Sequence, residues 1–167
     1  MNALQSPIPP SLTDRASAAD VVTAYAMALD ARDWARFRCL FEDVIEIDYS
    51  SLGSISAELP ADEWAARCGV LGMFDATQHK VSNFGYVFDG ERAAVTSYVD
   101  AAHFIAVDGE VLEAFAQGIY IHTLNRAGES WKIARCEFRL IGCPGGRAAF
   151  DKAFSAARER FAARQPL

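Results

Sequence analysis

The amino-acid sequence predicts an α+β fold, in which a cone-shaped, curved sheet, largely antiparallel but mixed, wraps around N-terminal helices and is closed by a C-terminal helix. Three observations carry this prediction. Apolar residues recur at helical spacing near the N-terminus, four β-rich segments follow one another between glycine-containing turns, and the last segment again has helical spacing. The concave face of such a sheet is a natural place for a ligand.

The N-terminal third is predicted to be helical after a flexible arm at residues 1–12, which holds three prolines and has no periodicity. A single domain follows at residues 13–167. Thr13 or Ser17 is expected to cap the first helix. Its inward face is carried by residues at helical spacing: Val21, Val22, Tyr25, Ala28 and Leu29. A second, short helix is expected at residues 34–41, pointing inward Trp34, Phe37, Leu40 and Phe41.

The middle of the chain changes from helix to strand. Alternation at residues 44–49 predicts a first strand, and Pro60 is expected to open a third helix. Four longer strands are then predicted at residues 77–88, 92–106, 111–124 and 130–141. The expected hairpin turns are Asp89-Gly90, Asp108-Gly109 and Ala127-Gly128. A last helix, at about residues 147–163, presents Phe150, Phe154 and Phe161.

Composition excludes several classes of protein. The chain has 167 residues, of which 51% are hydrophobic, and a net charge of −6 that would repel a nucleic acid. No apolar run approaches the roughly 20 residues that span a bilayer, and residues 1–10 do not resemble a signal peptide, so we expect a soluble, cytoplasmic protein. The four cysteines are expected to be free thiols, and the three histidines lack metal-binding spacing, so no metal is expected.

Asp30 and His79 are the first candidates for chemistry. Asp30 lies at the edge of the apolar face and near the end of the first helix, where a carboxylate is unfavourably placed. Alternation directs His79, Val81 and Asn83 inward from their strand. A carboxylate on one imidazole nitrogen would leave the other as a base near neutral pH. Taken singly, the two residues are also compatible with a solvated helix end and a satisfied core histidine.

Three further polar residues are weaker candidates. His103 has small neighbours that leave room for a cavity. The phenol of Tyr49, at the end of the first strand, could donate to a ligand oxygen. His122 precedes a turn, and we expect it to be exposed.

Several segments, in the same order along the chain, resemble scytalone dehydratase, a member of the SnoaL-like branch of the nuclear-transport-factor-2-like superfamily. They are LDARDW (29–34), IDYSSL (47–52), LPADE (59–63), VLG (70–72), TQH (77–79), FDKAF (150–154) and RERF (158–161). The resemblance covers most of the chain after the N-terminal arm. It implies a cone-shaped barrel, usually trimeric, that dehydrates a polyketide-derived bicyclic ketone of secondary metabolism without a cofactor.

Carried over by position, the resemblance makes His79 the general base and acid, with Asp30 as the group that orients it. His103 corresponds to a second pocket histidine, and Tyr49 to a tyrosine that polarises the substrate carbonyl through water. The apolar walls and the lid helix of the site are matched by Val70, Leu71, Phe150 and Phe154.

This sequence departs from the family pattern on the side of the site that would face the carbonyl. Leu29 stands where the family has a second tyrosine, and Leu52 where it has a pocket aromatic. Gly118 and Tyr120 stand where a serine and an asparagine contact substrate. Tyr120 or Tyr25 could replace the missing phenol. We therefore expect a related dehydratase acting on a different aromatic or polyketide-type ketone. An isomerase or cyclase using the same base, and a non-catalytic small-molecule binder, stay open as alternatives.

Overall fold

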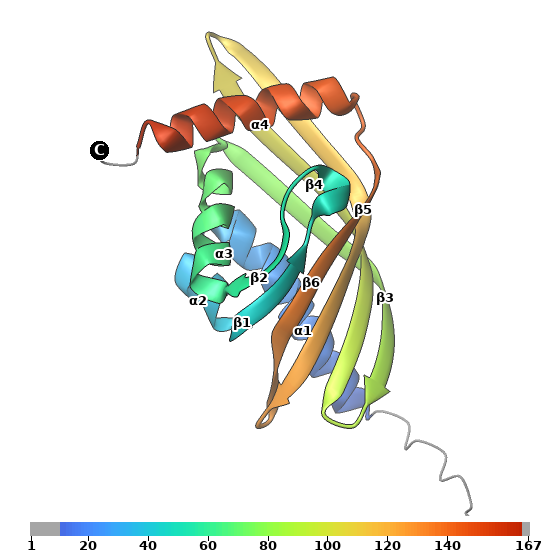
Figure 1. The fold of residues 1–167 in the computed structure, drawn as a ribbon. Helices are drawn as coiled ribbons and strands as arrows, with labels where there is room; N and C mark the ends of the chain where they lie inside the picture. Colours follow the sequence, from blue (N-terminus) through green and yellow to red (C-terminus); the bar gives the residue numbers. More distant parts are fainter. Residues whose placement is uncertain (1–10, 165–167) are drawn as a thin grey trace, which may run out of the picture.

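The computed structural model describes residues 11–164, which form helices at both ends of the chain and a sheet between them (Figure 1). The helices are α1 (Leu12–Ala31), α2 (Trp34–Cys39), α3 (Ala61–Cys68) and α4 (Arg147–Ala162), with short 3-10 turns η1 (Ser50–Leu52) and η2 (Gly69–Met73). The strands are β1 (Phe41–Asp48), β2 (Ser56–Pro60), β3 (Ala76–Asp89), β4 (Arg92–Val107), β5 (Glu110–Ala127) and β6 (Ser130–Gly142). The predicted α+β fold class is confirmed.

The six strands form one mixed sheet in the order β2-β1-β6-β5-β4-β3. Strands β3 to β6 are the predicted antiparallel meander, and β1 adds to it in parallel with β6. The three predicted turns join these strands, and Gly90, Gly109 and Gly128 there all have positive φ angles. Strand β2 was not predicted. It pairs with β1 at the edge of the sheet.

Helix α1 lies against the inner face of the curved sheet, mainly against β3 and β6. Ser11 caps its N-terminus by accepting a hydrogen bond from the backbone N–H of Asp14, so the predicted caps at Thr13 and Ser17 are wrong. The first ten residues of the predicted arm lie outside the described residues; of its last two, Ser11 is the N-cap of this helix and Leu12 its first residue. Arg32 ends the helix in a left-handed conformation, with φ at 55°.

Two other local predictions need correction. The second helix ends at Cys39 rather than at residue 41, and Phe41 is the buried first residue of β1. In β3 the register shifts between Ser82 and Gly85, where Asn83 has a φ of 55°. This bulge breaks the alternation that predicted an inward Asn83, and the side chain is exposed.

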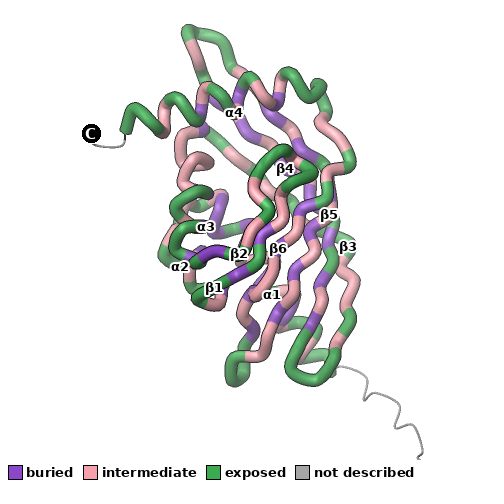
Figure 2. The backbone as a smooth tube through the Cα atoms, in the orientation of Figure 1, coloured by how far each residue is buried: buried purple, intermediate pink, exposed green. Residues whose placement is uncertain are grey.

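The main core lies between α1 and the concave face of the sheet (Figure 2). Its largest fully buried side chains include Trp131, Tyr25, Phe37 and Phe41. Helix α4 crosses one end of the sheet, where it contacts β5 and η2 (Figure 1). None of the helices in the described part of the chain is both long enough and apolar enough to cross a bilayer.

Candidate active site

The structure brings Asp30, from the end of α1, against His79 on β3. The imidazole Nδ1 donates to Oδ1 of Asp30 over 2.7 Å, and the backbone N–H of His79 donates to Oδ2 over 2.7 Å. Thr77, two residues earlier on the same face of the strand, donates its hydroxyl to Oδ1 over 2.9 Å. The His79 side chain is only 4% exposed. Because the carboxylate holds the proton on Nδ1, Nε2 is the nitrogen left to accept one.

These hydrogen bonds decide the ionisation of Asp30. Burial alone would raise the pKa of this carboxyl, but the hydrogen bonds from the side chain and backbone of His79 and from Thr77 outweigh it and lower the pKa. The carboxylate therefore stays ionised at neutral pH and orients the imidazole. Arg32 adds support, because its guanidinium donates to Thr77 Oγ1 and to the carbonyl of Phe74.

His103 stands beside this pair on β4. Its ring meets that of His79 edge to face, with centroids 5.1 Å apart. Nδ1 lies 3.0 Å from the carbonyl oxygen of Ala114, which can only accept, so this nitrogen carries the proton and Nε2 is a free acceptor. Burial lowers the pKa of His103 to about 4, which leaves the ring neutral. His103 can therefore accept a hydrogen bond from a ligand hydroxyl.

Two phenols come from elements remote in sequence from this pair. The hydroxyls of Tyr25 on α1 and Tyr49 after β1 lie 2.7 Å apart. Burial raises the pKa of each phenol well above its ordinary value, so both keep their protons. Tyr49 stacks on Phe138 with ring centroids 5.6 Å apart. The pair is a source of neutral hydrogen-bond donors.

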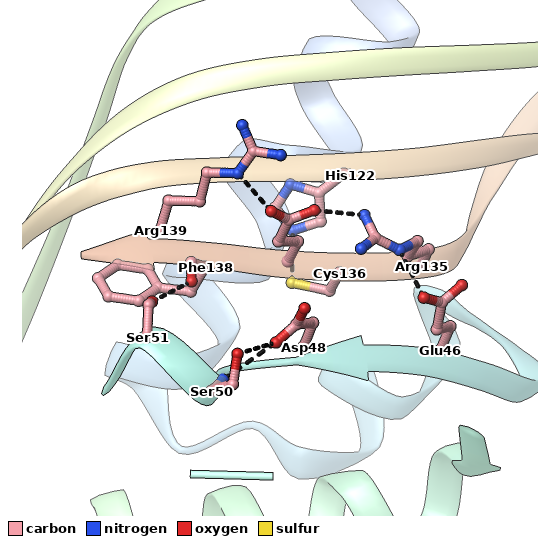
Figure 3. Close-up of polar contacts among 10 residues, drawn as sticks. Glu46, Asp48, Ser50, Ser51, His122, Arg135, Cys136, Phe138 and Arg139 are labelled. Carbon is pink, nitrogen blue, oxygen red and sulfur yellow. Dashed lines mark hydrogen bonds and ion pairs between the residues drawn. The ribbon is translucent and has the colours of Figure 1, made fainter. Parts of the chain in front are cut away.

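The turn that follows Tyr49 is fixed to strand β6 (Figure 3). Ser51 donates to the carbonyl of Phe138 over 2.5 Å and accepts from the backbone N–H of Leu140 over 3.0 Å. Asp48 accepts from the N–H and the hydroxyl of Ser50, which closes the turn. These contacts hold Tyr49 and the following η1 turn in place at the edge of the cavity.

A cavity of about 470 Å³ joins these groups, within the range of small-molecule sites. It lies under α4 and beside α3. The polar side chains that face it at its inner end are those of His79, His103, Tyr25, Tyr49 and Tyr120. The apolar lining includes Leu29, Leu52, Val70, Leu71, Phe150 and Phe154. Asp30, which was also predicted for the site, does not line the cavity but lies behind His79.

Gly118 does not line the cavity. A Cβ atom at this position would lie 2.6 Å from the ring of Phe138 and 2.5 Å from the carbonyl oxygen of Arg139. The aromatic ring therefore occupies the space in front of this glycine. Its place in the fold is explained by packing.

The exposed position predicted for His122 is wrong. Its side chain is fully buried, and Nε2 lies 3.3 Å from Sγ of Cys136, which is also buried. His122 shares strand parity with the buried Tyr120 and Leu124, and β5 continues to Ala127, so the turn is farther away than expected. Nothing in the spacing of the sequence indicated a role for Cys136.

Among residues 11–164, no three His, Cys, Asp or Glu side chains gather in an arrangement that could hold a metal ion.

Comparisons with known proteins agree with this architecture. The sequence profile of the SnoaL-like domain family matches residues 10–137. A solved structure of the Kfla4162 protein from Kribbella flavida is similar to the chain at 22% identity and a TM-score of 0.74, covering 82% of this chain and 97% of that one. A "Putative Scytalone Dehydratase" from Novosphingobium aromaticivorans is similar at 24% identity and a TM-score of 0.69, over 79% and 87% of the two chains.

A hexachlorocyclohexane dehydrochlorinase, LinA type 2, is similar at 18% identity and a TM-score of 0.66, over 79% of this chain and 88% of that one. At these identities the structures speak for the fold alone. No protein of curated function is similar enough to count as a match. The profile match, which covers most of the chain, decides the family: the chain belongs to the SnoaL-like domain family.

Proposed function

We propose that the protein is a cofactor-independent dehydratase that eliminates water from a hydroxylated aromatic or polyketide-type ketone. The observation that carries the proposal is the Asp30–His79 hydrogen bond of 2.7 Å at the wall of a largely apolar cavity. A base that is oriented by a carboxylate and shielded from water is what proton abstraction next to a carbonyl needs.

The reaction would proceed on the side chains already present. Nε2 of His79 takes the proton from the carbon next to the carbonyl, and the C–H electron pair forms an enolate. The enolate then collapses to a C=C bond as the C–O bond of the β-hydroxyl breaks. The leaving oxygen takes the proton back from His79, so one water is released and the imidazole is restored. His103, with Nε2 as a free acceptor, would orient the leaving hydroxyl.

The enolate oxygen needs a hydrogen-bond donor, and the hydrogen-bonded pair of Tyr49 and Tyr25 supplies it. Leu29 stands where related enzymes are expected to have a second tyrosine. Tyr25 is four residues earlier on α1 and therefore on nearly the same face of that helix. Its hydroxyl, 2.7 Å from that of Tyr49, supplies a second phenol by another route. Such donors typically contribute a few kcal/mol to an acyl or enolate transition state.

The experiment uses 3-hydroxy-1-tetralone, which becomes 1-naphthol when it loses water. The wild-type protein is expected to form naphthol with a mass lower by one water, and His79→Ala and Asp30→Asn to lose at least about a hundredfold in kcat/KM. Full activity in both variants would overturn the assignment of the base.

The same assay separates the alternatives. An isomerase or cyclase would give a product of unchanged mass. A binding protein would hold the ketone without turnover, and its affinity would change little in His79→Gln. Either result would replace the dehydratase proposal.

A further inference from the structure

Two buried polar residues behind Tyr49 have no part in the proposed reaction. Sγ of Cys136, on β6, lies 3.6 Å from the hydroxyl of Tyr49 and 3.3 Å from Nε2 of His122 on β5. Both side chains have no exposed surface, and Figure 3 shows them facing each other across the two strands. With Tyr25, they make a continuous row of four polar groups that ends at the cavity.

The two members of this row that lie farthest from the cavity, Cys136 and His122, are both neutral. Burial raises the pKa of the Cys136 thiol to about 12 and lowers the pKa of His122 to about 3. The His122 ring packs edge to face against the rings of Tyr25 and Tyr120, whose centroids are 5.1 and 5.4 Å away. The row is therefore a chain of neutral donors and acceptors, and its direction depends on where the imidazole carries its proton.

The surroundings of His122 favour one tautomer. Nδ1 is buried and has no hydrogen-bond partner among the described residues. A proton on Nδ1 would leave an unpaired N–H, which is rarer in protein interiors than an unpaired acceptor. With the proton on Nε2, the imidazole donates to Sγ, and the thiol is free to donate to the oxygen of Tyr49.

The direction of the chain decides what the phenols can do. If the thiol donates to Tyr49, one hydroxyl of the Tyr49–Tyr25 pair bonds the other, and one phenol O–H is left for a ligand. If the thiol instead accepted from Tyr49, Tyr25 would donate to Tyr49 and no O–H would be left. The tautomer of His122 therefore bears on whether the Tyr49–Tyr25 pair has an O–H to offer to the cavity.

We propose that the Tyr49–Tyr25 pair forms a binding site for an oxygen anion, a phenolate or an enolate, and that Cys136 and His122 are the positioning residues that direct its free O–H into the cavity. The inference rests on the proposed function only in taking that oxygen to be the enolate of the substrate. The site itself would bind a phenolate without any turnover.

The test uses 4-nitrophenol, whose ionised form is yellow, so the absorbance of the bound probe reports its own ionisation. In the wild-type protein the bound probe is expected to ionise at lower pH than in Cys136→Ala. The expected difference is about three- to tenfold in the ratio of phenolate to phenol, the effect typical of one ordinary hydrogen bond. Cys136→Ser, which keeps a donor and an acceptor at the same place, should restore the wild-type ratio, and His122→Phe should lower it.

A double-mutant cycle distinguishes positioning from packing. If Cys136 acts through Tyr49, removing the thiol in a Tyr49→Phe background should have no further effect on the ratio. An equal effect of Cys136→Ala with and without Tyr49, or no rescue by serine, would overturn the proposal. Cys39→Ala, at an exposed cysteine, is the control for thiol removal.

A repeat in a His79→Ala background keeps this outcome separate from that of the proposed function. Without the imidazole, the phenolate cannot be held by a protonated His79, so the Cys136 effect should persist. If it vanishes there, the anion is bound by His79 and the proposed site is wrong. Thermal unfolding of every variant checks that each one is folded at the temperature of the titration.

Discussion

Gly118→Ala offers a direct test of the packing around the cavity. A Cβ atom at Gly118 would lie 2.5 Å from the carbonyl oxygen of Arg139 and 2.6 and 2.7 Å from two atoms of the Phe138 ring. These separations are far inside van der Waals contact, and the carbonyl belongs to a strand that cannot move freely. Overpacking of this kind costs about 1–3 kcal/mol in unfolding free energy, and the backbone clash places Gly118→Ala toward the upper end.

Gly142 provides a matched control at the end of the neighbouring strand β6. It has an ordinary φ, and no atom lies within 4 Å of where its Cβ would be, so Gly142→Ala should change stability by no more than about 0.5 kcal/mol. Urea unfolding followed by tryptophan fluorescence measures both variants. For a chain of this size, the loss at Gly118 corresponds to a fall in Tm of about 2–4 °C per kcal/mol.

The opposite result would have a clear meaning. If Gly118→Ala were as stable as Gly142→Ala, the space before Gly118 would be open rather than filled by Phe138. The expectation from the sequence, that this position contacts the substrate, would then regain its basis. A change in ligand affinity without a change in stability would support that expectation.

Three further predictions concern ionisation, thiol reactivity and the closing helix. The native pKa values of His103 and His122 are lowered from 6.5 to about 4 and about 3. Because the unfolded chain then binds protons that the folded chain excludes, the free energy of unfolding is highest above pH 6.5 and falls as the pH drops from 6.5 toward these native pKa values. For His103 the loss is on the order of 3 kcal/mol by pH 4, and chemical unfolding that shows no slope between pH 6.5 and 4.5 would contradict it. Maleimide should label the exposed Cys39 at neutral pH long before Cys136, whose thiol is buried; peptide mass spectrometry that finds equal rates would refute this. Arg160→Gln should lower the free energy of unfolding by about 1–2 kcal/mol and speed hydrogen exchange in α4, because the Arg160 guanidinium donates to carbonyls of both η2 and β4. Unchanged exchange in α4 would show that these hydrogen bonds do not hold the helix in place.

The sequence predicts the long elements of this fold well, because their patterns are strong. The meander from β3 to β6 is indicated by the alternation of apolar residues and by glycines at the turns, and all three glycines have positive φ angles. Strand β2 is different. Only Leu59 of its five residues is buried, and Pro60 ends it, so there is almost no alternation to detect. The bulge at Asn83 could not be predicted for a related reason, because one extra residue in a strand does not show in the hydrophobic pattern of the sequence.

The two sides of the candidate site differ in how far the sequence could predict them. Asp30 and His79 each stand out locally, one at a helix end and the other on the inward face of a strand. The phenol pair and the residues behind it come from α1, the turn after β1, β5 and β6, and only the packing of those elements brings Tyr25 to Tyr49 and Cys136 to His122. A buried cysteine in a strand is an ordinary core residue by every local measure.

Helix α1 explains why the two sides of the site meet in one cavity. Tyr25 and Asp30 are five residues apart on this helix, which corresponds to a rotation of about 140° and a rise of about 7.5 Å. Tyr25 contacts Tyr49, just after β1, and Asp30 contacts His79 on β3. Strands β1 and β3 lie far apart in the order of the sheet. A single rigid helix therefore sets the spacing between the base and the donors. Arg32 ends this helix and is itself bonded to Thr77 and to the carbonyl of Phe74, so the register of α1 is fixed at the end where the base is oriented.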